Sequence, residues 1–226
     1  MPRPVPRQCD NPAAIGEDPT IDLVVFDLGG VLMELSGVAE MGRLTGIHSE
    51  ETGIHSEEQI WARWLSCEWV RRFERGRCSI EEFSSGIVAD WGLDTDAEAF
   101  TENFSSWLVG PFPGATELVR QVGSRCTTAC LSNSNEAHWR RLSRWGVLTW
   151  FDHLFFSHEM DRIKPDRDAF EHVVAATGCP ADRILFLDDN RMNVEAAQAV
   201  GWRAERVPGV AEARQALVEH GLLDRP

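Results

Sequence analysis

Hydrophobic and polar positions change in regular blocks along the chain, and after residue 110 these blocks predict strands and helices in turn. Short apolar runs, typical of buried parallel strands, lie at 21–26, 127–131, 151–157, 184–187 and 204–207. Apolar residues at helical spacing lie at 115–122, 135–145, 166–177, 194–200 and 211–220. Repeated strand–helix units predict a doubly wound, Rossmann-like α/β fold with a parallel sheet and helices on both faces.

The stretch from 35 to 110 has a different pattern, with helical signals throughout. Ser56 precedes Gln59, and Ser79 precedes Glu82, by the spacing of a capping box. Asp94 is the expected cap of a third helix. Aromatic and aliphatic residues follow each start at helical spacing, and after Ser56 they continue from Ile60 to Trp69 in one expected helix. This pattern predicts a small helical bundle.

This change in pattern divides the chain into parts. We expect an N-terminal tail over 1–20, an α/β core built from 21–34 and 111–226, and a helical cap over 35–110. The two crossings between core and cap are expected to act as hinges, so that closure of the cap excludes water and selects the substrate.

Composition narrows the classes of function. The net charge is −14, which disfavours nucleic acid as a partner, because such binding needs a basic face. An anionic substrate would need local positive groups or a metal. No run approaches the roughly 18 apolar residues of a membrane span, so we expect a cytoplasmic protein with no membrane contact. The six cysteines form no CxxC pair, which argues against a zinc site.

One heptad, TGIHSEE, occurs twice in tandem, at 45–51 and 52–58. Seven residues make about two helical turns, so the first copy is expected to lengthen a loop or the preceding helix. His48 and His55 come with the repeat and are interpreted as solvated loop histidines.

Polar residues stand where predicted strands end. They are Asp27 after the first strand, Ser132 and Asn133 after the second, and Asp188 and Asp189 after the fourth. Each group alone could be a turn or a helix cap. Together they should meet, because sites in parallel sheets form beyond the carboxyl ends of the strands. Three carboxylates in one crevice call for a cation, and Mg²⁺ prefers oxygen ligands.

Lysine is nearly absent, since 21 of the 22 basic residues are arginine and the exception is Lys164. A carboxylate, a metal, a lysine and small hydroxyl or amide groups are the parts needed for phosphoryl transfer. A compact ammonium suits a slot that the planar fork of arginine would not fit.

Four motifs in this order resemble those of the haloacid dehalogenase superfamily of hydrolases, in the branch with a helical cap after the first motif. They are Asp27–Val31 (DLGGV), Leu131–Asn135 (LSNSN), Arg162–Asp166 (RIKPD) and Phe186–Ala197 (FLDDNRMNVEAA). Within the superfamily they are most similar to bacterial sugar phosphatases of the α-glucose-1-phosphate phosphatase type. The resemblance implies a Mg²⁺-dependent phosphatase acting on a small phosphorylated metabolite, a sugar phosphate; a homodimer stays open.

The resemblance also implies a role for each motif residue. Asp27 would be the nucleophile that forms an aspartyl-phosphate, and Lys164 would bridge it to the phosphate. Ser132, the amide of Asn133 and Gly30 would bind the phosphoryl group. The Mg²⁺ ion would be held by Asp27, the Gly29 carbonyl, Asp189 and Asp188, with Asn193 supporting these ligands from behind.

One position departs from the pattern of the phosphatases. They carry a second Asp two residues after the nucleophile, as a general acid and base, and this chain has Gly29 there. General acid–base help contributes roughly 10²–10⁴-fold. Three interpretations stay open: a phosphatase with another proton source, a 2-haloacid dehalogenase that works without a metal, or a weakly active relative that binds a ligand or partner. The paired Asp188 and Asp189 favour the phosphatase.

The arginines of the predicted cap are candidates for binding a second anionic group of the substrate, although a solvated surface is the expected place for most. They are Arg63, Arg71, Arg72, Arg75 and Arg77.

Overall fold

A computed structural model describes residues 20–45 and 56–225. Its main sheet is parallel and has the strand order β5–β4–β1–β6–β7. The strands are β1 (Leu23–Phe26), β4 (Thr127–Ser132), β5 (His153–Phe156), β6 (Ile184–Asp188) and β7 (Arg203–Arg206). The predicted doubly wound α/β fold is therefore confirmed. The expected tail and most of the duplicated heptad, including His48 and His55, lie outside the described residues.

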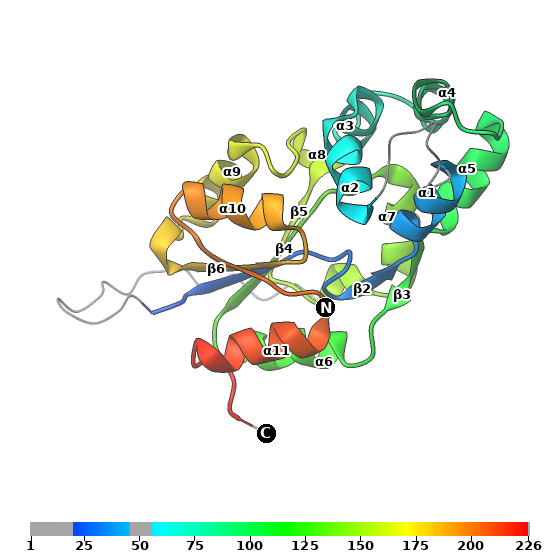
Figure 1. The fold of residues 1–226 in the computed structure, drawn as a ribbon. Coiled ribbons are helices and arrows are strands. Elements are labelled where there is room, and N and C mark those ends of the chain that lie inside the picture. The colour runs from blue at the N-terminus through cyan, green and yellow to red at the C-terminus, as the bar shows by residue number, and fades with distance from the viewer. Residues whose placement is uncertain (1–19, 46–55, 226) are drawn as a thin grey trace.

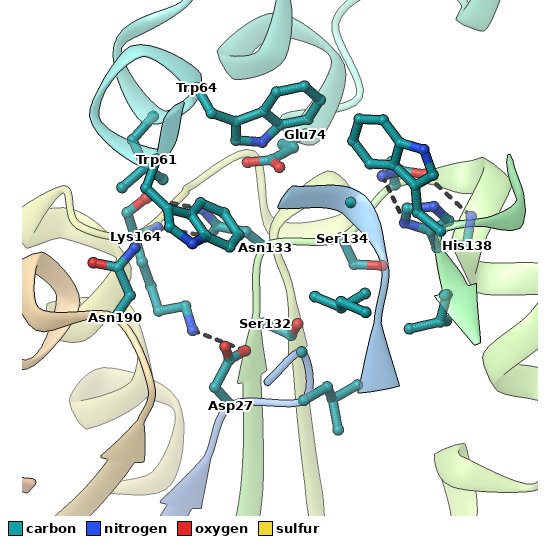
Figure 2. Close-up of a pocket in the computed structure, with 18 of the residues that line it drawn as sticks. Asp27, Trp61, Trp64, Glu74, Ser132, Asn133, Ser134, His138, Lys164 and Asn190 are labelled. Carbon is teal, nitrogen blue, oxygen red and sulfur yellow. Dashed lines mark hydrogen bonds and ion pairs between the residues drawn. The ribbon is translucent and has the colours of Figure 1, made fainter. Parts of the chain in front are cut away.

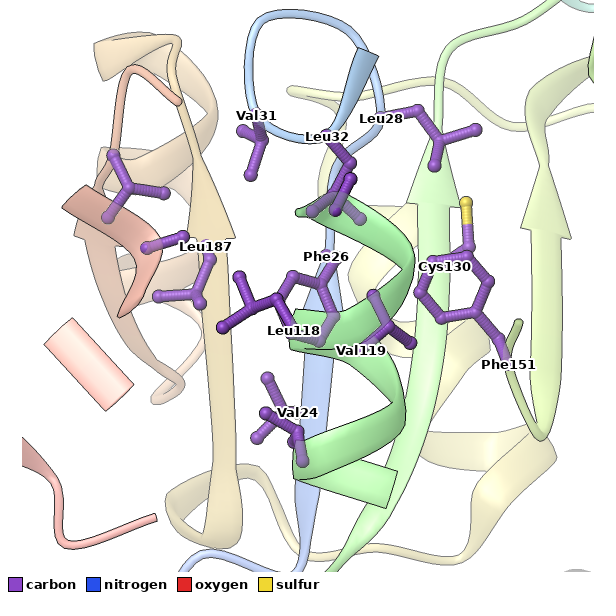
Figure 3. Close-up of a cluster of buried hydrophobic side chains, with 14 of the residues drawn as sticks. Val24, Phe26, Leu28, Val31, Leu32, Leu118, Val119, Cys130, Phe151 and Leu187 are labelled. Carbon is purple, nitrogen blue, oxygen red and sulfur yellow. The ribbon is translucent and has the colours of Figure 1, made fainter. Parts of the chain in front are cut away.

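Helices cover both faces of this sheet (Figure 1). The alternation of β1 shows why, because its successive side chains point to opposite faces. Val24 and Phe26 pack in the cluster that includes α6 (Ala115–Gly123) and α11 (Val210–Glu219), as Figure 3 shows. Leu23 and Val25 pack in the cluster that includes α9 (Arg167–Thr177) and α10 (Arg191–Ala199). All four residues of β1 are buried, as a central parallel strand requires.

Shorter elements complete this part of the molecule. After β4 come α7 (Glu136–Arg144) and the 3₁₀ turn η1 (Val147–Thr149), and after β5 comes α8 (Ser157–Met160). The 3₁₀ turn η2 (Ala181–Arg183) leads into β6. No helix within the described residues is long and apolar enough to cross a membrane.

Five helices between β1 and β4 share a hydrophobic cluster of their own. They are α1 (Gly37–Thr45), α2 (Glu57–Ser66), α3 (Glu68–Glu74), α4 (Ile80–Trp91) and α5 (Ala97–Ser106). Aromatic rings fill the cluster, with Phe73 stacked on Phe83 at a centroid distance of 4.4 Å. The division at 34/35 and 110/111 into core and cap stays a prediction.

An antiparallel pair that the sequence pattern did not predict joins the two parts of the chain. β2 (Met33–Leu35) pairs with β3 (Leu108–Pro111) at the two positions where the chain passes between the sheet and the five helices. The pair is only three or four residues long, which is too short for a periodic signal to appear.

The helix starts were predicted with two errors. The capping boxes Ser56–Gln59 and Ser79–Glu82 are both present. The third cap is Asp96 rather than Asp94, because the Asp96 carboxylate accepts a hydrogen bond from the Ala99 amide at 2.8 Å. The helix expected to run from 57 through Trp69 is interrupted at Cys67, whose backbone is extended, so α2 and α3 are separate helices.

The core packing of α6 yields a stability prediction. Leu118 is fully buried between the sheet and α11, so Leu118→Ala should lower the free energy of unfolding by about 2–5 kcal/mol. Val109, which is 46% exposed on β3, offers the control, and Val109→Ala should change it by less than about 0.5 kcal/mol. Urea unfolding followed by circular dichroism measures both. Equal effects of the two substitutions would contradict this packing.

Candidate active site

The three polar strand ends meet at one edge of the sheet. β1 lies between β4 and β6, with Phe26 in register with Cys130 on one side and Leu187 on the other. Asp27, one residue beyond β1, is fixed by its amide, which donates to the Leu187 carbonyl at 2.9 Å. The convergence expected of parallel strands is therefore what the chain adopts.

Lys164 is buried between two of the carboxylates. Its Nζ lies 2.9 Å from Asp27 Oδ1 and 2.6 Å from Asp188 Oδ2, and its side chain is 1% exposed. Burial disfavours the charged amine, but the attraction of Asp188 and Asp27 outweighs burial and raises the pKa of Lys164. The ammonium is therefore charged at neutral pH and forms ion pairs with both carboxylates.

The Asn133 side chain fixes the backbone of Lys164. Its Nδ2 donates to the Lys164 carbonyl at 2.9 Å, and its Oδ1 accepts from the Lys164 amide at 2.8 Å. The sequence suggested the amide of Asn133 only as a group that binds the phosphoryl oxygens, so the use of its side chain to hold Lys164 was missed. Ser132, the last residue of β4, is buried and lines the cavity above Asp27 (Figure 2).

The three aspartates form a compact acidic cluster. One oxygen from each of Asp27, Asp188 and Asp189 lies within 4.8 Å of the others. Burial raises the pKa of Asp27 to about 6, against the opposing attraction of Lys164. Burial and the charges of Asp27 and Asp188 raise the pKa of Asp189 to about 8. Lys164 alone does not offset the repulsion of Asp189 by Asp27 and Asp188, and a bound cation would relieve it.

Polar groups behind the cluster hold Asp188 in place. Asn193 Nδ2 donates to both of its carboxylate oxygens, at 3.2 and 3.1 Å, and the Asn190 amide donates to Oδ1 at 2.8 Å. Asn193 Oδ1 is itself buried without a hydrogen-bond partner in the described structure. An all-oxygen donor set with a spare buried amide oxygen fits a hard divalent cation such as Mg²⁺.

The glycines after Asp27 are set by close approach. A Cβ on Gly30, whose φ is +74°, would lie 2.3 Å from Asp189 Oδ2, so only glycine lets this turn reach the cluster. A Cβ on Gly29 would lie 2.3 Å from Leu35 Cδ1. Leu35 of β2 thus occupies the space where the side chain of an acid at position 29 would begin.

A cavity of about 130 Å³ opens above the cluster, about ten times the space that one water molecule needs. Its floor carries the polar residues just described. Its upper walls come from α1, α2, α3, α5, α7 and β2–β3 and are mostly apolar. The apolar lining residues are Leu28, Leu35, Met41, Ile60, Trp61, Trp64, Leu65, Phe104, Trp107, Leu108 and Leu142.

Two titratable groups line the upper part of this cavity, and neither was predicted as a site residue from the sequence. His138 of α7 is half-buried beside α5, where Nε2 contacts the Phe104 carbonyl at 3.0 Å and Nδ1 contacts Asn135 at 3.3 Å. Burial lowers the pKa of His138 to about 4, so the ring is neutral.

The other group is Glu74, at the end of α3. Its side chain is buried, and burial raises its pKa to about 7. The signal was present in the sequence, because Glu74 follows Val70 by four residues and so lies on the buried face of its helix.

None of the five candidate arginines lines the cavity. Arg71 and Arg75 both bond Asp166, at 2.6 and 2.5 Å, and Arg77 pairs with Asp161. The other two lie over tryptophan rings, Arg63 over Trp91 and Arg72 over Trp69. These arginines therefore contact acidic or aromatic side chains and do not line the cavity.

Comparison with known proteins places the chain among hydrolases. The family model for haloacid dehalogenase-like hydrolases matches residues 21–201. A sesquiterpene phosphatase of Aspergillus oryzae is 26% identical, covering 80% of this chain and 87% of that protein. An (S)-2-haloacid dehalogenase of Pseudomonas putida is 24% identical, covering 80% and 83%. Among solved structures, a HAD family enzyme of Bacteroides thetaiotaomicron in complex with magnesium and inorganic phosphate matches with a TM-score of 0.62 and 23% identity, covering 82% and 93%.

The buried position of Lys164 yields a prediction about stability. In magnesium-free buffer, Lys164→Ala should lower the free energy of unfolding by about 3–5 kcal/mol, because it leaves buried carboxylates unpaired. Lys164→Arg should also destabilise, by about 1–3 kcal/mol, since a larger planar group must fit a packed slot. The control is Arg167→Lys, at an exposed position at the start of α9, with almost no change expected. Wild-type stability of Lys164→Arg would contradict the tight fit.

Proposed function

The chain belongs to the haloacid dehalogenase-like hydrolases, and on that premise we propose that it is a magnesium-dependent phosphatase acting on a small phosphate monoester. The observation that carries the proposal is the acidic cluster of Asp27, Asp188 and Asp189 around one buried ammonium. A haloacid dehalogenase that works without a metal would have no use for the third carboxylate. Phosphatases among the relatives agree with this choice.

Each residue of the floor has a task in this proposal. Asp27 attacks phosphorus with one carboxylate oxygen and forms an aspartyl-phosphate. Lys164 neutralises the phosphoryl oxygens while it holds Asp27 in line. Ser132, Gly30 and the amide of Asn133 bind the phosphoryl group, and the Asn133 side chain positions Lys164.

Magnesium would be held by Asp27, the Gly29 carbonyl, Asp189 and Asp188, with Asn193 orienting Asp188. When bound, the ion supplies positive charge against the negative charge of the phosphate and of the aspartates. The helices α1–α5 would act as a mobile cap over residues 35–110, closing on the substrate and excluding water.

The alcohol part of the substrate meets the upper walls. The sequence resemblance predicts a sugar phosphate, and that identity stays a prediction. The tryptophans and aliphatic residues of the lining favour an apolar alcohol instead, because burying apolar surface contributes about 25 cal/mol per Å² while unpaired sugar hydroxyls would lose hydration. The relative named for sesquiterpene substrates is consistent with that alternative.

The proposed activity is tested by measuring phosphate release from a panel of monoesters, with and without Mg²⁺. Activity should require the ion and should fall by at least about 10³-fold in Asp27→Asn, which removes the nucleophile. Asp182→Asn, an exposed aspartate on η2, is the matched control and should behave as wild type. Undiminished turnover by Asp27→Asn would contradict the mechanism. Chloride release from a 2-haloacid without phosphate release would identify a dehalogenase.

The preference of the upper walls for an apolar alcohol is tested with two phosphate monoesters that differ in the alcohol. An apolar alkyl or prenyl phosphate should have a kcat/KM about tenfold or more above that of glucose 1-phosphate, because it buries apolar area against the tryptophans. Trp61→Ala should reduce that preference, whereas Trp69→Ala, whose ring is not among the lining residues, should keep it. A preference for the sugar ester that survives Trp61→Ala would support the sugar phosphatase.

A further inference from the structure

Five titratable side chains line the cavity, and four of them are already engaged. Asp27 and Asp189 belong to the acidic cluster, and Lys164 is paired with two carboxylates. His138 is neutral and has both ring nitrogens in hydrogen bonds. Glu74 is the fifth, and nothing in the proposed chemistry yet uses it.

Glu74 stands across the cavity from the nucleophile. Figure 2 shows its carboxyl group beneath the ring of Trp64, on the opposite side of the space from Asp27. A phosphate bound at Asp27 would direct its alcohol oxygen away from the attacking carboxylate, since the attacking and leaving oxygens lie in line. Glu74 is thus on the side of the leaving group.

The Glu74 side chain is positioned by a hydrogen bond and by the attachment of its helix, and not by an ion pair of its own. Trp64 hydrogen-bonds its carboxyl group. The nearby arginines of α3 are committed elsewhere, because Arg71 and Arg75 both bond Asp166. Asp166 lies two residues after Lys164, so these bonds tie the helix that carries Glu74 to the loop that carries the ammonium. No ion pair of Glu74 itself occurs within residues 20–45 and 56–225.

A buried glutamate without an ion pair costs folding free energy, and this favours a role in catalysis over a role in stability. Burial raises the pKa of Glu74 to about 7, so at neutral pH it exists both with and without its proton. A general acid that later acts as a base needs a pKa near the working pH. The Trp64 hydrogen bond and Lys164 oppose the shift, and the charge of Asp27 adds to it.

We propose that Glu74 is the proton donor to the leaving alcohol, in the role that Gly29 and the adjacent Leu35 leave unfilled; this inference rests on the proposed phosphatase function. The carboxylic acid of Glu74 gives its proton to the ester oxygen as the bond from that oxygen to phosphorus breaks and the bond from Asp27 to phosphorus forms. Water then attacks phosphorus and passes a proton to the Glu74 carboxylate, the Asp27–phosphorus bond breaks, and inorganic phosphate leaves.

Charged groups on the elements around α3 influence the pKa of Glu74, and so the pH dependence of the activity. Lys164 and Asp27 act from the cavity floor, and Arg71 acts from α3 itself. Gly76, just beyond α3, approaches the backbone of His158 on α8, while α4 packs against α3 through Phe83. A proton donor must be protonated, so activity limited by the first step should fall as pH rises through the pKa of Glu74.

The test compares two esters of different leaving groups in Glu74→Gln, which keeps the shape of the side chain and removes its proton. With an alkyl phosphate, kcat/KM, which reports the steps up to departure of the alcohol, should fall by about 10²–10⁴-fold, because the alkoxide needs a proton. With p-nitrophenyl phosphate, kcat/KM should change by less than about tenfold, because that leaving group departs without one. The alkaline fall of the alkyl phosphate profile should disappear in the variant, and Glu74→Asp should restore part of the rate.

The control is Glu68→Gln, at the exposed start of the same helix, which should match wild type with both esters. Thermal melting shows that each variant is folded. Equal losses of kcat/KM with the two esters, or an unchanged pH profile, would overturn the role of Glu74 while leaving the phosphatase intact. Absence of phosphate release by wild type from both esters would overturn the proposed function itself.

Discussion

The site depends on one buried ammonium held between two carboxylates. Lys164 contacts Asp27 at the end of β1 and Asp188 at the end of β6, and its backbone is fixed by Asn133 just beyond β4. One residue therefore links three neighbouring strands at the edge where they end. Such a group is stable only with its partners in place, because an unpaired buried charge is costly. The same arrangement places the carboxylate that we propose as nucleophile, a cation and an acidic cluster within a few ångströms.

The helices above the sheet contribute what the floor lacks. The floor is rich in carboxylates, and Leu35 fills the space beside Gly29 where the side chain of a further acid would begin. The upper walls bring apolar surface together with one buried acid, Glu74. The bonds of Arg71 and Arg75 to Asp166 connect both halves, so movement of these helices would carry Glu74 toward or away from the bound phosphate.

The sequence predicted the floor well and the upper walls poorly, for physical reasons. Asp27, Ser132 and Asp188 end parallel strands, so their convergence follows from topology. Lys164 was marked by its rarity, but its hold by the Asn133 side chain depends on how two loops meet, which no local pattern encodes. Glu74 was not predicted, because the residues of 35–110 at helical spacing were interpreted as the packed core of a helical bundle. Asp96 was missed as a cap because Asp94 offered the same chemistry two residues earlier.

In the proposed mechanism, Asp27 becomes covalently phosphorylated during turnover. Rapid acid quenching with a phosphorus-32-labelled ester, followed by peptide mapping, measures this directly, since acyl phosphates survive acid and are cleaved by base. The account predicts base-labile label on the peptide that contains Asp27, and none in Asp27→Asn. Turnover without any labelled protein, or label on another residue, would contradict it.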